Sequence, residues 1–115
     1  MATLEIDGLE LVVRLGTLEK VEAVHDDVRV ALKCVTSVEV LEHPIKEIHG
    51  LRIGTGIPGS VAIGTFTSRT ETIFAIIHHH TPSAVQVRLA EAPFDRIIIG
   101  CPDPASVVTS LRGAL

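Results

Sequence analysis

The C-terminal stretch from residue 96 to residue 115 reads RIIIGCPDPASVVTSLRGAL and predicts a buried strand followed by a helix. Its run of three isoleucines is short, apolar and β-branched, which is typical of a strand buried on both faces. Asp103 is a good N-cap residue, and Pro104 fits the first position of a helix, where its missing N–H costs nothing. Apolar residues then recur at helical spacing, at Val107, Val108, Leu111 and Leu115. We therefore expect a helix over about 103–114 that lays its apolar side on a sheet or over a barrel end.

Upstream of this stretch, apolar residues alternate with polar ones, as in strands with one face in the core and one in water. The alternation is clear at 4–7, 9–15, 28–33 and 84–90, and weaker strand patterns occur at 35–41, 60–66 and 72–78. Between them, residues 17–24 have helical spacing and Thr17 as a cap, which indicates a helix of two turns, with an irregular strand as the alternative. The order of elements predicts a mainly β (α+β) chain. We expect a bent antiparallel sheet in meander order, or a partly open barrel, with a C-terminal capping helix.

The composition supports a β-rich core and excludes some partners. The chain has 115 residues, enough for one domain spanning 1–115. Val, Ile and Thr supply 14, 12 and 10 of these residues, and aromatic residues only 3%, so the core is aliphatic. The net charge is −4 and the basic residues are scattered. We therefore expect no binding to nucleic acid or to anionic membrane surfaces.

The sequence also indicates where the protein resides. The N-terminal residues have no basic region followed by an apolar run, so no signal peptide is visible, and no apolar run is long enough to span a bilayer. Cys34 and Cys101 are too few for a disulfide scaffold. We expect two reduced, buried cysteines and a cytoplasmic location.

A glycine-rich segment matches G-x-G-x-x-G at Gly54, Gly56 and Gly59. A dinucleotide-binding fingerprint needs a strand before this motif and a helix that begins inside it. Pro58 lies within the motif, and residues 60–66 have a strand pattern, so we exclude the dinucleotide interpretation. We interpret residues 49–59 as a tight loop between strands, in which glycines adopt positive φ.

A second hypothesis for this segment is a backbone nest that binds an anion. Its candidate ligand-binding residues are His49, Arg52, Thr55 and Gly56. Titration with phosphate, sulfate and nucleotides tests this hypothesis.

The triplet His78-His79-His80 is the other candidate site. On a strand, His78 and His80 share a face, where two imidazoles can chelate one metal ion. Zinc sites need three or four ligands, and no other His or Cys lies at a spacing that identifies it as the third. We predict no metal site and no cofactor, and His78 and His80 are the candidates if a metal binds.

No catalytic residue is predicted. Ser60 is not part of a G-x-S-x-G elbow, and Ser106 is explained by its place in the first turn of the helix. Cys101 lies near a helix N-terminus, which lowers a thiol pKa, but it also suits the end of a core strand, which is the interpretation we prefer.

The segment 50–59, which reads GLRIGTGIPG, stands ahead of Val61-Ala-Ile-Gly64, and a late strand is followed by Asp103-Pro104 and an apolar helix. With this pattern the chain resembles the bacterial pleckstrin-homology-like (PH-like) domains over about residues 35–115. The resemblance implies two nearly orthogonal sheets with the C-terminal helix at one end. Family members that bind phosphoinositides carry basic residues around the first hairpin. This chain has Glu5, Asp7 and Glu10 there, so we expect no phosphoinositide headgroup binding.

Three functions follow as hypotheses. The leading one is a non-enzymatic binding or interaction module that binds a protein partner or self-associates through sheet edges or a helix face. The second is a carrier of a small or lipid-like ligand in the sheet interior. The third is a metal-dependent hydrolase that uses His78 and His80.

Overall fold

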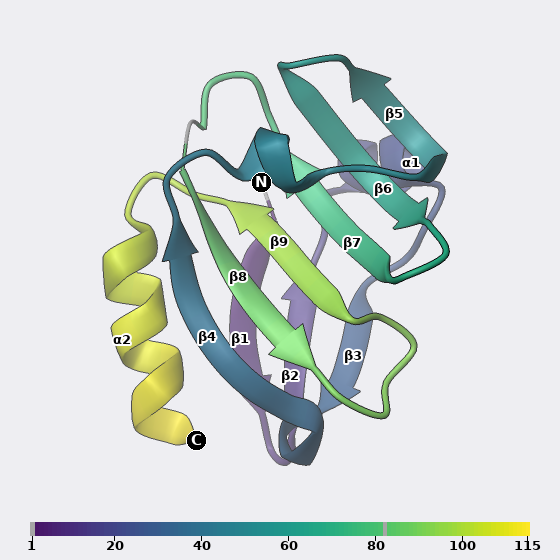
Figure 1. Ribbon diagram of the computed structural model, residues 1–115. Coiled ribbons are helices and arrows are strands. Elements are labelled where there is room, and N and C mark those ends of the chain that lie inside the picture. Colours follow the sequence, from purple (N-terminus) through teal and green to yellow (C-terminus); the bar gives the residue numbers. More distant parts are fainter. Residues whose placement is uncertain (1, 82) are drawn as a thin grey trace.

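A computed structural model describes residues 2–81 and 83–115 of the chain (Figure 1). The strands are β1 (Thr3–Asp7), β2 (Glu10–Arg14), β3 (Val28–Ala31), β4 (Val35–Leu41), β5 (Leu51–Ile57), β6 (Val61–Thr67), β7 (Thr72–Ile77), β8 (Ala84–Leu89) and β9 (Arg96–Gly100). The helices are α1 (Thr17–Ala23) and α2 (Pro104–Ala114), with short 3₁₀ turns η1 (Leu32–Cys34) and η2 (Pro44–Glu47).

The strands form two sheets, and the mainly β class with a C-terminal helix is confirmed. A three-stranded antiparallel sheet has the order β1-β2-β3, and a six-stranded sheet has the order β4-β8-β9-β7-β6-β5. Figure 1 shows the small sheet behind the large one, with α2 along one side next to β4. The large sheet is bent and does not close into a barrel.

The simple meander order is wrong, because β4 pairs with β8 and β9 separates β8 from β7. Strand β9 lies between β8 and β7, antiparallel to β8 and parallel to β7. This central position explains why the run of three isoleucines contains no polar residue. Ile97 and Ile99 face the core between the sheets, and Ile98 lies in a second apolar cluster on the other face, as expected for a strand buried on both sides.

That second cluster covers the outer face of the large sheet, the face turned away from the small sheet. It is closed by the segment between β4 and β5, which contains η2 and packs Ile45 and Ile48 against the cluster. The strands contribute small and branched side chains together with Phe66. The cluster members are Ala62, Phe66, Ile73, Ala75, Ile77, Ala84 and Ile98.

The predicted loop at 49–59 is wrong, because its middle forms strand β5. Residues Leu51–Ile57 pair with β6 along their whole length, and only residues 58–60 make the turn. The alternation of Leu51, Ile53, Thr55 and Ile57 is a strand pattern that the intervening glycines conceal in the sequence.

Helix α2 begins where the sequence predicts. Asp103 is the N-cap and accepts a hydrogen bond from the Ser106 backbone N–H at 3.3 Å, and Pro104 is the first helical residue. Val108 and Leu111 are buried as expected, whereas Leu115 at the end of the stripe is 56% exposed. None of the helices in the described part of the chain is long and apolar enough to cross a membrane.

Candidate functional site

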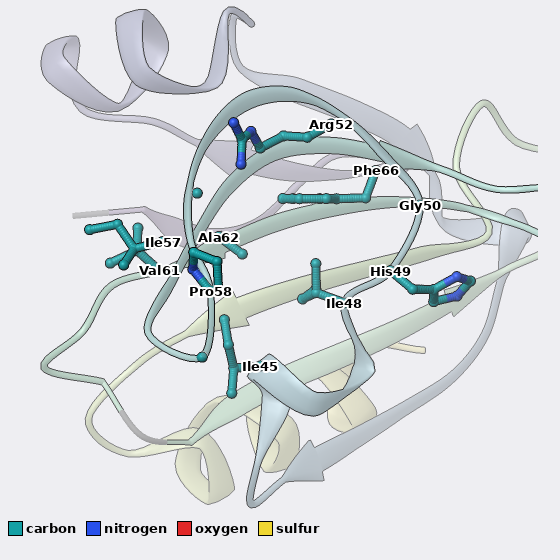
Figure 2. Close-up of a pocket in the computed structure, with 12 residues that line it drawn as sticks. Ile45, Ile48, His49, Gly50, Arg52, Ile57, Pro58, Val61, Ala62 and Phe66 are labelled. Carbon is teal, nitrogen blue, oxygen red and sulfur yellow. The ribbon is translucent and has the colours of Figure 1, made fainter.

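A pocket of about 280 Å³ opens on the outer face of the large sheet, between β5, β6 and the segment that contains η2 (Figure 2). We call it the outer pocket. Ala62 and Phe66 of β6 and Ile45 and Ile48 of the covering segment give it an apolar lining. The further lining residues are His49, Gly50, Arg52, Gly56, Ile57, Pro58, Gly59 and Val61.

Two glycines produce the concave shape. Gly54 and Gly64 are directly opposite each other on β5 and β6, with φ of 140° and 141°. A Cβ atom on either one would collide with the backbone of the other strand, so only glycine permits this close approach. The strand pair bends here, and Arg52 on one side of the bend comes over Gly56 on the other.

Arg52 lies at the mouth of the outer pocket and opposite Phe66 on β6. A Cβ atom at Gly56 would lie 2.7 Å from the Arg52 Nη1 atom and 3.1 Å from its Cδ atom, so the glycine leaves room for the guanidinium. Among the residues that the structure describes, the Arg52 side chain has no hydrogen-bond or ion-pair partner. Its positive charge is therefore available to a ligand.

His49 also lines the outer pocket but is already engaged. Its Nε2 atom is 2.8 Å from Oε2 of Glu71, and Figure 2 shows its ring pointing away from Arg52. Glu71 also accepts two hydrogen bonds from Arg96, both at 2.7 Å. The hydrogen bonds from Arg96 and His49 hold the pKa of Glu71 below its ordinary value, against the opposing effect of burial.

The structure brings three of the four predicted ligand-binding residues together. His49, Arg52 and Gly56 line one pocket, whereas Thr55 lies on the opposite face of β5. There the Thr55 hydroxyl donates a hydrogen bond to the Glu22 carbonyl of α1 at 2.9 Å. The proposed nest also changes, because Gly54–Gly56 belong to a paired strand instead of a free loop.

The three histidines are not on a strand, contrary to the expectation from their spacing. They follow the end of β7 and form a turn, in which the Thr81 N–H donates to the His78 carbonyl. The rings of His78 and His80 stack with centroids 5.5 Å apart. Within residues 2–81 and 83–115, no group of three or more His, Cys, Asp and Glu side chains is arranged to hold a metal ion.

His78 instead contacts a buried carboxylate that sequence reasoning missed. Glu19 of α1 is only 4% exposed, and its Oε2 atom is 2.8 Å from Nε2 of His78. The carboxylate also accepts hydrogen bonds from the backbone N–H groups of Ala2 and Gly16, at 3.0 and 2.8 Å. Burial raises the pKa of Glu19, but the hydrogen bonds from His78, Gly16 and Ala2 outweigh it, and the pKa is below 4.5.

A second missed residue is Arg96, which is 5% exposed under the covering segment. It donates hydrogen bonds to Glu71, Glu47 and Gln86 at 2.7–2.8 Å. The sequence does contain a signal for this placement. Arg96 and Ile98 are two positions apart on one strand, so their side chains point to the same, outer face. Its role is to satisfy polar groups beside the outer pocket.

The surroundings of Cys101 disfavour ionisation of its thiol. Burial is the main cause that raises its pKa, and the nearby Asp103 carboxylate adds to the effect. A raised pKa disfavours the thiolate that nucleophilic catalysis needs.

No family model, curated protein or solved structure matches this chain.

Proposed function

We propose that the protein is a non-enzymatic interaction module that self-associates through a surface made by α1 and β5. The observation that supports the proposal is a concentration of exposed apolar side chains. Of the eight large hydrophobic side chains that are exposed in the described part of the chain, six belong to these two elements. They are Leu18, Val21 and Val24 in and directly after α1, and Leu51, Ile53 and Ile57 of β5. We call them the α1–β5 surface.

The two halves of this surface adjoin. The Thr55 hydroxyl binds the Glu22 carbonyl, so α1 and β5 are in direct contact. Figure 1 shows α1 directly behind β5 and β6. A contiguous exposed apolar patch on a folded chain is typical of an interaction site.

The free edge of the large sheet is part of the same surface. Within residues 2–81 and 83–115, strand β5 pairs on one side only, with β6. Its one charged residue is Arg52, so it has few of the charges that usually block edge pairing. The opposite edge is protected. There Arg112 of α2 donates hydrogen bonds to the Val38 carbonyl of β4 at 2.7 and 3.0 Å.

A second copy of the chain suits the β5 edge. In an antiparallel pair of β5 strands about a two-fold axis at Gly54, Leu51 faces Ile57 of the second copy and Ile53 faces Thr55. Gly54 then faces Gly54. No Cβ atom would then lie at the two-fold axis to obstruct the approach of the two strands.

Sedimentation velocity of the protein, from micromolar to sub-millimolar concentration, tests the proposal. We expect the unmodified chain to form dimers as concentration rises. Ile53→Lys places a charge on the edge and should keep the chain monomeric at every concentration. Leu9→Lys is the matched control, because Leu9 is 84% exposed in the turn between β1 and β2. A monomer at all concentrations, or equal effects of both variants, contradicts the proposal.

The two alternative functions receive less support. The apolar hollow between α2, β2 and β4 has no space for even a water-sized molecule, so this part of the interior offers no room for a carried ligand. For a hydrolase, His78 is bound to Glu19 and no third ligand is in place among the described residues. The resemblance to PH-like domains stays a prediction.

A further inference from the structure

We propose that the outer pocket is a binding site for a small carboxylate with an apolar group. The carboxylate meets Arg52 and the apolar group lies on Phe66 and the isoleucines of the covering segment. Ile57 lines the outer pocket and also belongs to the α1–β5 surface, so the two sites adjoin at the end of β5.

The charged side chains in and beside the pocket favour an anionic ligand. The lining residues of the pocket include no Asp or Glu. Glu71, which contacts the lining residue His49, and Glu47, next to Ile48 in the chain, are both bound to Arg96. The guanidinium of Arg52 has no partner among the described residues, and Gly56 keeps the space beside it open. A guanidinium binds a carboxylate through two parallel hydrogen bonds, which gives both affinity and orientation.

The apolar lining of the pocket favours an anion that also carries an apolar group. Ala62 and Phe66 are 2% and 5% exposed and form the floor, with half-buried Ile45 and Ile48 beside them. Phe66 is the cross-strand partner of Arg52, so the aromatic ring and the positive charge are adjacent. A ligand that carries its carboxylate directly on a branched or aromatic group can reach both at once.

The size and the single charge favour a monocarboxylate over a phosphate. About 280 Å³ is the lower end of the range for ligand pockets and suits a body no larger than one amino acid. Doubly charged phosphate groups usually need several donors or cations, and this pocket supplies one guanidinium. A free amphipathic acid and the C-terminal residue of a peptide have the same chemistry here.

Titration followed by NMR chemical shifts tests the proposal with three small probes: N-acetyl-leucine, its neutral amide and inorganic phosphate. We expect N-acetyl-leucine to shift the signals of the pocket residues, and the amide and phosphate to bind at least about tenfold more weakly. A tripeptide that ends in leucine distinguishes the two sources of the carboxylate. Binding of this peptide more tightly than N-acetyl-leucine indicates a protein C-terminus, and weaker binding indicates a free acid.

Matched variants show whether Arg52 carries the binding. Arg52→Gln should weaken N-acetyl-leucine at least about tenfold. Arg69→Gln should have no effect, since Arg69 is also an exposed arginine without a partner among the described residues but does not line the pocket. Gly56→Ala is an independent second variant, because its methyl group displaces the guanidinium while the strand conformation remains allowed.

The same titration in Ile53→Lys separates this site from self-association. Equal affinity in that variant supports a pocket complete within one chain, whatever becomes of the proposed dimer. The proposal is overturned if no carboxylate binds at millimolar concentration, if acid and amide bind equally, or if Arg52→Gln leaves the affinity unchanged.

Discussion

Gly54 and Gly64 allow a close approach of β5 and β6 that other residues would obstruct. Each has a backbone conformation that L side chains rarely adopt, and each lies against the backbone of the opposite strand. Gly59 in the following turn also has a positive φ, of 76°, but a Cβ atom there meets open space. Substitutions at Gly54 and Gly59 can therefore distinguish the free-energy cost of a positive φ from the cost of a collision with the neighbouring backbone.

We expect Gly54→Ala to destabilise the protein by about 2–4 kcal/mol, because it adds backbone collision to an unfavourable φ. Gly59→Ala should cost only about 1 kcal/mol, for the conformation alone. Urea unfolding at neutral pH measures both. Similar costs for the two variants would show that the close approach of β5 and β6 does not matter for stability.

For single residues, the sequence predicts roles that depend on partners nearby in the chain, and it does not predict roles that depend on partners far away in the chain. Asp103 was found as an N-cap because its partner, the Ser106 N–H, is three residues away. Glu19 and Arg96 were missed as buried ionic groups. Their partners His78 and Glu71 are 59 and 25 residues distant, so only the fold brings them together.

Among the elements, α2 was the most predictable, since its cap, its proline and its apolar side are all local signals. We expect Asp103→Ala to cost about 1 kcal/mol, because the Ser106 N–H loses its acceptor. Ser110→Ala, on the exposed side of the same helix, should change the stability by less than about 0.5 kcal/mol. Thermal unfolding of the two variants side by side checks the cap, and equal melting temperatures would refute it.

Strand β5 was the least predictable element. Glycines at two of its seven positions lower the strand propensity, and Pro58 directly after it suggested a turn. Pairing with β6 overrides these local signals. The sequence therefore predicts the residues of the candidate site, since Arg52, His49 and Gly56 do share a pocket. It does not predict their setting, which is a paired strand instead of a loop.

For the whole molecule, buried and paired carboxylates predict lower stability in acid. Glu19, Glu39 and Glu71 all have a pKa below 4.5 in the folded protein. A lowered folded-state pKa contributes stability that is fully present above pH 4.5 and is lost as the pH falls through the folded-state value. The free energy of unfolding should therefore decrease steadily below about pH 5.

Glu19→Gln tests the carboxylate of these three that is buried, at 4% exposure. At neutral pH we expect it to cost roughly 1–3 kcal/mol, because the N–H groups of Ala2 and Gly16 lose charged acceptors. Its unfolding free energy should also depend less on pH in the acid range. Glu42→Gln, at an exposed position without a partner among the described residues, is the control. Denaturant unfolding from pH 7 to pH 3 compares them, and parallel curves for Glu19→Gln and the unmodified chain would exclude the role of Glu19.

The strands themselves were largely predictable, but their order in the sheet was not. Alternation and β-branched runs locate β4, β6, β7, β8 and β9 to within one residue at each end. The same signals contain no information on which strand pairs with which. The parallel contact between β7 and β9 depends on β8 leaving β7 and pairing with β4 instead.

The central place of β9 also affects the protein while it is being made. During synthesis, β7 and β8 emerge from the ribosome before β9, yet β9 lies between them in the folded sheet. A nascent chain that ends before residue 96 therefore has two interior strand edges without their partner. Ile73, Phe74, Val85 and Val87 of these strands, which are fully buried in the finished protein, lack their cover at that stage. Until residues 96–100 emerge, the facing edges of β7 and β8 lack their partner strand and are open to pairing with other chains.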